Sequence, residues 1–154
     1  MLEDEPAYQQ QLAASAAYAG LPRGPVHADL FRDNVMFEGD ALTGLFDFYF
    51  AGVDTLLFDI AVCLNDWCID IDSGRLVEER AGAFVDAYGR VRRLDGTELR
   101  LLPALMRAAA LRFWISRLWD LHLPRDAAVL TAHDPTHFER VLAQRRAAPW
   151  HPNR

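Results

Sequence analysis

The hydrophobic positions of this chain mostly follow helical spacing, which a short extended region interrupts near the start. An Ala- and Gln-rich stretch over residues 6–19 favours helix. The Gly- and Pro-containing segment 20–25 is expected to break that helix. Residues 35–38 and 42–48 are rich in β-branched and aromatic side chains, and the intervening Gly39-Asp40 is typical of a turn. The sequence therefore predicts a β-hairpin here.

A buried helix is predicted after the hairpin. Residues 54–68 are apolar nearly all round, which is typical of a helix in a protein core, and Asp54-Thr55 offers its N-cap. Residues 72–74 then predict a turn, and the spacing over 76–88 predicts an amphipathic helix. Gly89 is expected to end that helix.

Two more helical regions are predicted toward the end of the chain. Residues 97–102 favour one or two helical turns, after which Pro103 suits the first position of a long helix to about Leu121. Asp134-Pro135 is a cap and first-turn pair, so a last helix is expected from Pro135 to about Ala147. The tail over residues 149–154 is expected to fray.

Together these elements predict a mostly helical α+β protein with one small hairpin. A chain of 154 residues is about one ordinary domain, and no linker or internal repeat divides it. A globule of this length buries about 68–70% of the surface that its unfolded chain exposes. We therefore expect a single domain over residues 1–154 with a core of its own.

Composition and charge exclude several functions. The net charge is −6, which gives no general attraction to nucleic acid or to an anionic membrane. No apolar run reaches 18 residues, so no membrane span is expected. All 16 basic residues are arginines. This chain therefore supplies no Walker lysine, no Schiff-base lysine and no lysine to anchor ATP.

The cysteines and the first residues predict a compartment. Cys63 and Cys68 form no disulfide framework and are expected to be reduced thiols in the core. The first residues include three acids, whereas a signal peptide begins with basic residues. We therefore expect a cytoplasmic protein.

Polar side chains collect on both sides of the predicted hairpin. His27, Asp29, Arg32 and Asn34 precede it, together with Asp33, and Asp47 follows it. A hairpin that leaves Asn34 and returns to Asp47 brings these two residues side by side. Their oxygens are hard ligands of the kind that Mg²⁺ prefers. Asp29 is expected to face the same place as a proton acceptor.

These residues carry a resemblance to a known family. The chain has the pattern H-x-D-x-x-x-x-N at residues 27–34, then a hairpin, then Asp47-Phe48-Tyr49 and Asp59-Ile60-Ala61. This order resembles the protein-kinase-like fold of the aminoglycoside phosphotransferase and choline kinase superfamily. The longer strings are most similar to its homoserine kinases: HADLFRDNV and FDFYFAGVDTLLFDIAVCLNDWCID. The similarity is strong over residues 26–70 and weaker over 110–118.

The resemblance implies a role for each matching residue. Asp29 would be the catalytic base, and Asn34 and Asp47 would hold Mg²⁺ on the phosphates of ATP. His27 and Asp59 would support the catalytic loop. The implied reaction transfers the γ-phosphate of ATP to the hydroxyl of homoserine, in threonine biosynthesis. Phosphoryl transfer depends mainly on positioning and charge stabilisation, which suits this division of roles.

Several charged residues are candidates for binding the acceptor. Homoserine carries an ammonium and a carboxylate, so its site should offer both charges. Asp54 and Asp66 are candidates for the ammonium. Arg112 and Arg117 are candidates for the carboxylate, because a guanidinium can donate two parallel hydrogen bonds, although each could equally have a structural role. Arg32 and Asp33, which are specific to this loop, could contact substrate or form ion pairs with their surroundings.

The chain also departs from the family pattern. A whole kinase of this kind has an N-terminal lobe with a loop over the phosphates and an ATP-anchoring lysine, neither of which is found here. The sequence therefore predicts the C-terminal lobe alone, which would self-associate or bind a separate N-terminal lobe. Two alternatives stay open. One is a phosphotransferase acting on an aminoglycoside, choline or a sugar, and the other is an inactive fragment or interaction domain.

Overall fold

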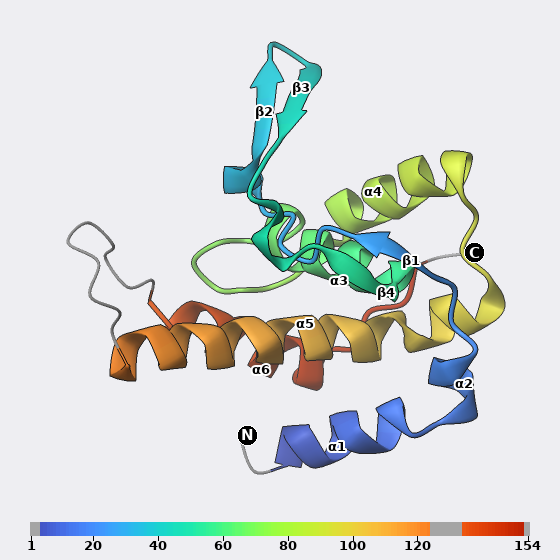
Figure 1. Ribbon diagram of the computed structural model, residues 1–154, viewed down its shortest axis with the longest axis vertical. Coiled ribbons are helices and arrows are strands. Elements are labelled where there is room, and N and C mark those ends of the chain that lie inside the picture. Colours follow the sequence, from blue (N-terminus) through green and yellow to red (C-terminus); the bar gives the residue numbers. More distant parts are fainter. Residues whose placement is uncertain (1–3, 124–133, 153–154) are drawn as a thin grey trace.

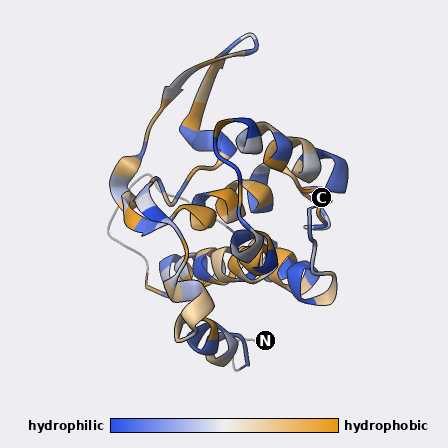
Figure 2. Cartoon of the chain, turned by 90° about the vertical axis from the view of Figure 1, so that its right-hand side faces the viewer, coloured by the Kyte–Doolittle hydropathy of each residue, from blue (hydrophilic) through white to orange (hydrophobic). Residues whose placement is uncertain are grey.

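The computed structural model describes residues 4–123 and 134–152, and its centre is one buried helix. This helix, α3 (Leu56–Trp67), packs against the long α5 (Gly96–His122) on one side and against β1 (Arg23–Val26) and β4 (Gly52–Thr55) on the other (Figure 1). Apolar residues concentrate on these central helices (Figure 2). The mostly helical α+β fold predicted from the sequence is therefore confirmed.

The longer remaining helices pack on α5 or on α3. The N-terminal α1 (Asp4–Ala13) and the C-terminal α6 (Thr136–Ala147) both pack on it. Short α2 (Ala16–Ala19) leads into β1, and α4 (Glu78–Val91) packs on α3. The core cluster draws on α3, α4, α5 and α6. No helix within the described ranges is long and apolar enough to cross a membrane.

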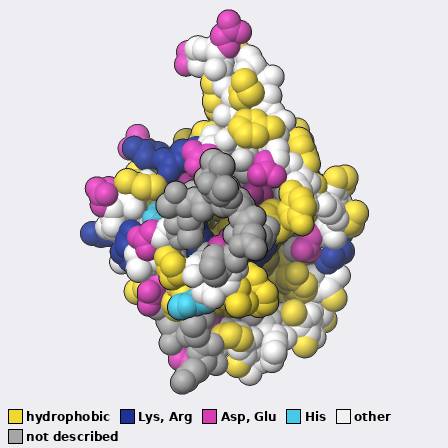
Figure 3. Space-filling view, turned by 60° about the vertical axis from the view of Figure 1, so that its left-hand side comes forward, with side chains coloured by type: hydrophobic (Ala, Val, Ile, Leu, Met, Phe, Trp, Pro, Cys, Tyr) yellow, Lys and Arg dark blue, Asp and Glu magenta, His cyan; other side chains and the backbone are white. Residues whose placement is uncertain are grey.

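The strands form two separate antiparallel pairs. The predicted hairpin is confirmed as β2 (Val35–Glu38) and β3 (Ala41–Leu45), although its second strand ends three residues earlier than expected. Gly39 in its turn has φ of 59°, a conformation that glycine adopts without strain. The hairpin projects from the body of the molecule (Figure 1). Its large apolar side chains are exposed (Figure 3): Met36, Phe37, Leu42 and Leu45.

The pairing of β1 with β4 corrects two expectations. The segment expected only to break a helix forms β1, with Gly24 opposite Asp54. Asp54 therefore belongs to a strand, and α3 begins two residues later than the predicted range 54–68. Of the pair predicted to offer the N-cap, Thr55 is the N-cap, and its hydroxyl accepts the Leu57 N–H at 3.2 Å. The four-residue partner strands are far apart in sequence, which explains why local propensity did not reveal them.

Several predicted helix boundaries also change. The first helix is interrupted at residues 14–15, where Ser15 caps α2 by accepting the Tyr18 N–H. Gly89 lies inside α4 and does not end it: the helix continues to Val91, and the N–H of the C-cap residue Arg92 donates to the Tyr88 carbonyl at 3.0 Å. The last helix is confirmed, with Asp134 accepting the Thr136 N–H at 2.9 Å.

Pro103 lies inside α5 and does not begin it. The helix starts earlier at a capping box in which the Asp95 carboxylate accepts the Glu98 N–H and the Glu98 carboxylate accepts the Asp95 N–H. This reciprocal pair is a stronger start signal than a proline in the first turn. Residues 1–3, which include the acid Glu3, and the last two residues of the tail lie outside the described ranges.

Candidate active site

The loop from His27 to Asn34 is attached to α3 at several points. The carboxylate of Asp59 accepts the N–H of His27 at 2.8 Å and that of Ala28 at 2.7 Å. One turn later, Cys63 contacts the Leu30 carbonyl, which also accepts the Trp67 Nε1–H at 3.0 Å. Asp66 also contacts the loop, because its Oδ2 accepts the Arg32 N–H at 2.8 Å. The contacting side chains thus occupy positions 59, 63, 66 and 67, a spacing that puts them on one face of a helix. The loop is therefore positioned by the central helix of the core.

Arg112 on α5 fixes the loop from the other side. Its Nη1 donates a hydrogen bond to the Ala28 carbonyl, and its guanidinium lies over the rings of Phe50, Phe58 and Phe113. Burial lowers the pKa of Arg112, and the nearby charge of Asp29 opposes that effect. These contacts occupy the guanidinium with the loop, which favours a positioning role over contact with a substrate carboxylate.

Asp29 is half-buried at the centre of this loop. Burial raises its pKa, the charge of Arg112 opposes that increase, and the charge of Asp47 adds to it. The side-chain Nδ2 of Asn34 donates to the Asp29 carbonyl at 2.7 Å and to Asp29 Oδ2 at 3.3 Å. The structure thus brings Asp29, Asn34 and Asp47 together, as the hairpin geometry predicted.

Asn34 and Asp47 meet at the base of the hairpin. Phe46, next to Asp47, donates its N–H to the Asn34 carbonyl at 3.2 Å. Asp47 is exposed, and its φ of 59° is a left-handed conformation that few residues other than glycine adopt. Positions in this region cluster at functional sites.

His27 lies beneath this group. Its Nε2 is 2.9 Å from the Phe46 carbonyl, and its ring lies 4.6 Å from that of Phe48. Since a carbonyl only accepts hydrogen bonds, Nε2 carries the proton. Buried Nδ1 has no hydrogen-bond partner within the described residues. His27 therefore links the start of the loop to the segment that carries Asp47.

The remaining residues predicted to bind the phosphoryl acceptor lie in two separate places. Arg32 and Asp66 pair with each other. The Asp66 carboxylate accepts hydrogen bonds from Arg32 Nε and Nη2, both at 3.1 Å, and from the Arg32 backbone N–H at 2.8 Å. Asp54 lies on β4 opposite Gly24 of β1, and its Oδ1 is 3.4 Å from Arg23 Nη2. Asp54 is thus not brought to the group around Asp29. Arg117 lies on α5 and lines a pocket with the Arg32–Asp66 pair.

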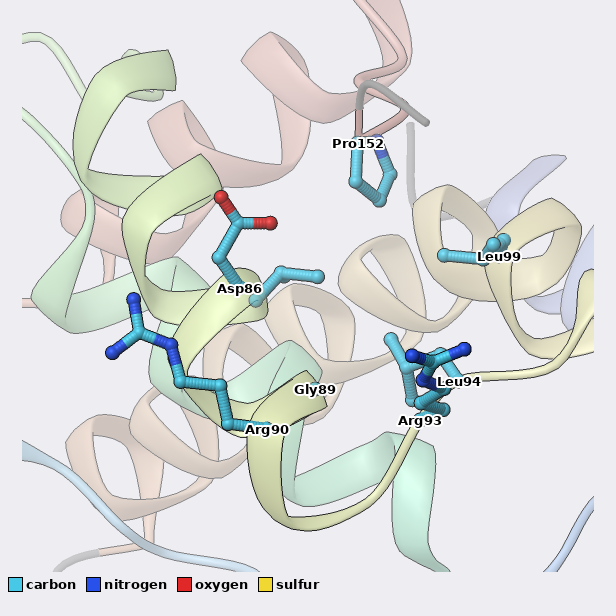
Figure 4. A pocket seen from close by; sticks show the side chains of 8 residues that line it. Asp86, Gly89, Arg90, Arg93, Leu94, Leu99 and Pro152 are labelled. Carbon is cyan, nitrogen blue, oxygen red and sulfur yellow. The ribbon is translucent and has the colours of Figure 1, made fainter.

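Sequence reasoning did not single out Trp67, whose Nε1–H donates to the Leu30 carbonyl of the loop. The signal was present in the eight-residue spacing from Asp59, which places both side chains on one helix face. A second pocket, of about 740 Å³, lies between the end of α4, the start of α5 and Pro152 (Figure 4). No residue that the sequence singled out for chemistry lines it.

Comparison with known proteins places this arrangement in a family. A model of the phosphotransferase enzyme family matches residues 2–102, which is more than half of the chain. The chain belongs to the phosphotransferase enzyme family. Residues 27–34, the hairpin and Asp59 all lie within the matched range.

Individual relatives in this family are similar over nearly the whole chain. The homoserine kinase of Polaromonas naphthalenivorans (strain CJ2) is 66% identical over 146 residues, which are 95% of this chain and 46% of the relative. The homoserine kinase of Janthinobacterium sp. (strain Marseille) is 58% identical over 94% of this chain and 45% of the relative. The homoserine kinase of Ralstonia pickettii (strain 12J) is 58% identical over 96% of this chain and 46% of the relative. The chain thus spans about half the length of the curated relatives it matches.

Proposed function

We propose that this chain supplies the catalytic half of a homoserine kinase, which transfers the γ-phosphate of ATP to the side-chain hydroxyl of homoserine. The juxtaposition of Asp29 with Asn34 and Asp47, beneath a hairpin and on a loop fixed to α3, is the observation that carries this proposal. The names of relatives at 66% and 58% identity supply the acceptor.

Asp29 is the proposed catalytic base. Its Oδ2 accepts a hydrogen bond from Asn34 Nδ2. Its Oδ1 has no hydrogen-bond partner within the described residues and can accept a proton. In the reaction, the acceptor oxygen forms a bond to the γ-phosphorus while the bond to the bridging oxygen of ADP breaks. The hydroxyl proton passes to Asp29. A base placed in this way contributes about 10²–10⁴-fold to the rate.

The donor set of the site fits Mg²⁺. Asn34 uses its amide nitrogen to hold Asp29, which leaves its amide oxygen as a free ligand, and Asp47 adds an exposed carboxylate. Within the described ranges, no group of three or more His, Cys, Asp or Glu side chains is placed to hold a metal alone. Two protein oxygens suit Mg²⁺, which keeps waters and binds nucleotide phosphates as its other ligands. When bound, the ion supplies positive charge beside the transferring phosphoryl group.

An exposed apolar surface beside the site fits a missing partner for the hairpin. Phe48 and Tyr49 follow Asp47, and Tyr49 is 80% exposed. The large apolar side chains of the hairpin are exposed as well. Apolar surface of this extent is typical of an interface. We propose that the half of the kinase that this chain does not match covers this apolar surface and completes the ATP site.

The free, buried cysteines of this chain fit the reducing cytoplasm, which we propose as its compartment.

A hybrid enzyme tests the proposal. This chain replaces the region it matches in the Polaromonas homoserine kinase, and ADP release is measured with homoserine, choline and an aminoglycoside. We expect homoserine-dependent turnover and growth without threonine in a strain that lacks homoserine kinase. Asp29→Asn should reduce turnover by about 10²–10⁴-fold, whereas the matched control Asp72→Asn, in an exposed turn, should not. A hybrid that prefers choline or the aminoglycoside would contradict the assignment of the acceptor.

A further inference from the structure

A charged pocket of about 360 Å³ lies next to the catalytic loop. It is lined by residues from the loop, the end of α3, the turn after α3, α5 and α6: Arg32, Asp33, Asp66, Ile71, Arg117 and His137. Its volume is at the small end of the range of about 300–1,000 Å³ for small-molecule sites. Both signs of charge line it, which suits a zwitterion better than a purely anionic or cationic ligand.

Arg117 provides the positive side of this pocket. Its guanidinium rests on the Phe138 ring, 4.4 Å from the centroid, and makes one long hydrogen bond of 3.3 Å to the Asp134 carbonyl. The other N–H groups have no acceptor within the part of the chain that the structure describes. Burial lowers the pKa of Arg117, and nearby acids, including Asp29, oppose that effect. A half-buried guanidinium with free donors is a ready partner for a carboxylate.

Asp33 provides the free negative charge. Asp66, the other acid in the pocket, already accepts three hydrogen bonds from Arg32. Asp33 follows Arg32 in the 3-10 turn η1 (Arg32–Asn34), is exposed, and makes no hydrogen bond or ion pair within the described ranges. The Arg32–Asp66 pair therefore fixes the turn that presents Asp33. Its four-residue separation from Asp29 keeps Asp33 on the same loop as the proposed base.

We propose that this pocket binds the α-amino acid end of the acceptor, with Arg117 holding the carboxylate and Asp33 holding the ammonium. The inference rests on the proposed function, because it takes Asp29 to mark the position of the reacting hydroxyl. It changes the sequence-based assignment of charges: Arg32 and Asp66 become positioning residues, and Asp54 has no part in acceptor binding. An amino acid held at both charged groups would extend its side-chain hydroxyl toward Asp29.

Three ligands separate the two contacts. Homoserine has both charged groups, 3-aminopropan-1-ol lacks only the carboxylate, and 4-hydroxybutyrate lacks only the ammonium. Their dissociation constants for the 154-residue chain are measured by calorimetry without nucleotide. Arg117→Gln should weaken the binding of homoserine and 4-hydroxybutyrate by about 10- to 100-fold and leave the dissociation constant of 3-aminopropan-1-ol within about twofold. Asp33→Asn should weaken the binding of homoserine and 3-aminopropan-1-ol and leave that of 4-hydroxybutyrate unchanged.

Matched controls have the same change of charge outside the pocket. Arg140→Gln removes an exposed arginine of α6 that bonds the Thr136 hydroxyl, and Asp40→Asn removes an acid in the hairpin turn. Neither should alter any of the three constants. Because Asp33 is exposed, its variant should fold, so a failure of Arg117→Gln to fold would not prevent the test.

The outcomes distinguish this inference from the proposed function. If Arg117→Gln and Asp33→Asn give the crossed pattern of losses, the proposed binding pocket is supported even when the hybrid enzyme turns over no homoserine. Lack of turnover would then overturn only the proposed function. Turnover of homoserine without the crossed pattern overturns only the pocket. Absence of homoserine binding to the wild-type chain, or equal weakening of all three ligands by both variants, also overturns it.

Discussion

Asp59 holds Ala28 in a left-handed conformation: its Oδ1 accepts the Ala28 N–H at 2.7 Å, and Ala28 has φ of 63°. This conformation costs an ordinary residue about 1–2 kcal/mol. The Arg112 hydrogen bond to the carbonyl of the same residue adds a second restraint. The direction in which the loop leaves β1, and with it the position of Asp29, therefore depends on an acid that touches neither substrate nor nucleotide in the proposed mechanism.

Replacing Asp59 should damage both stability and activity. Asp59→Asn leaves one acceptor oxygen for two backbone N–H groups and turns an amide N–H₂ toward the other. We expect a loss of about 1.5–3 kcal/mol in the free energy of unfolding, the usual value of hydrogen bonds to a charged group. Urea denaturation measures this loss. In the hybrid enzyme kcat should fall more than KM rises, and unchanged kcat would argue against a positioning role.

Asp47 offers a test of strain against function. Asp47→Gly removes a side chain from a left-handed position, so the free energy of unfolding should rise by about 0.5–1 kcal/mol. The same change removes a proposed Mg²⁺ ligand, so binding of Mg²⁺–ATP to the hybrid should weaken by at least about tenfold. Thermal unfolding and calorimetry give the two values.

Gly39 supplies the matching control for Asp47. It has the same φ of 59° in the hairpin turn, and a Cβ there would meet no other atom within 4 Å. Gly39→Ala should therefore destabilise the chain by about 1–2 kcal/mol through backbone strain alone. It should leave nucleotide binding unchanged. Weaker nucleotide binding in Gly39→Ala would show that the hairpin conformation, and not the Asp47 carboxylate, controls the metal site.

The fully buried carboxylate of Glu5 connects the first helix to the core. Arg107 donates to both of its oxygens, at 2.9 and 2.6 Å, and Gln9 donates at 2.9 Å. Burial raises the pKa of Glu5, but the hydrogen bonds and charges of Arg107, Gln9 and Arg146 outweigh it, so the pKa lies below the usual 4.5. Glu5→Gln should cost about 3–5 kcal/mol at pH 7, the value for breaking a buried ion pair.

The contribution of Glu5 should also depend on pH. A carboxyl whose folded pKa is lowered stabilises the fold fully above its unfolded pKa of about 4.5 and loses this contribution as the pH falls through the lower folded value. The difference in urea midpoint between wild type and Glu5→Gln should therefore be constant from pH 7 to 5 and shrink below pH 4.5. A difference that grows on acidification would contradict the assignment.

The thiols should be unreactive in the folded chain. Burial raises the pKa of Cys63 well above its usual range and raises that of Cys68 to about 11. Since the thiolate is the reactive form, alkylation by iodoacetamide at pH 8 should occur only at the rate of unfolding. Mass spectrometry across a urea series would show both sites reacting together at the unfolding transition. Rapid reaction of one cysteine without urea would indicate local opening at the end of α3.

The sequence predicted those parts of the fold that local patterns determine. The hairpin, the buried α3 and the last helix have strong signals within a few residues, and the comparisons confirm the kinase family that the spacing of His27, Asp29 and Asn34 suggested. The pairing of Arg23–Val26 with Gly52–Thr55 was missed, because it depends on a contact across the chain and its first strand contains Gly24 and Pro25.

Predicting which charged residues face one another was harder. The sequence offered Asp66 and Arg32 as separate candidates, yet they satisfy each other, because α3 places Asp66 next to the turn that carries Arg32. Asp54 was taken as a candidate because the ammonium of the acceptor calls for an acid. The direction of β4 carries it to the opposite end of the β1–β4 pair, beside Arg23. Such pairings depend on tertiary geometry, which local composition does not contain.

The attachment of the loop 27–34 to one face of α3 has a consequence for ligand binding. Because this loop is already ordered in the folded chain, its conformational entropy is lost during folding and need not be lost again when a substrate arrives. The hydrogen-bonded amides of His27, Ala28 and Arg32 should accordingly exchange with deuterium no faster than those of α3, in one cooperative unit. The readiness of the loop for chemistry is thus a property of the stability of the core, and a destabilised core would weaken binding before it unfolded the chain.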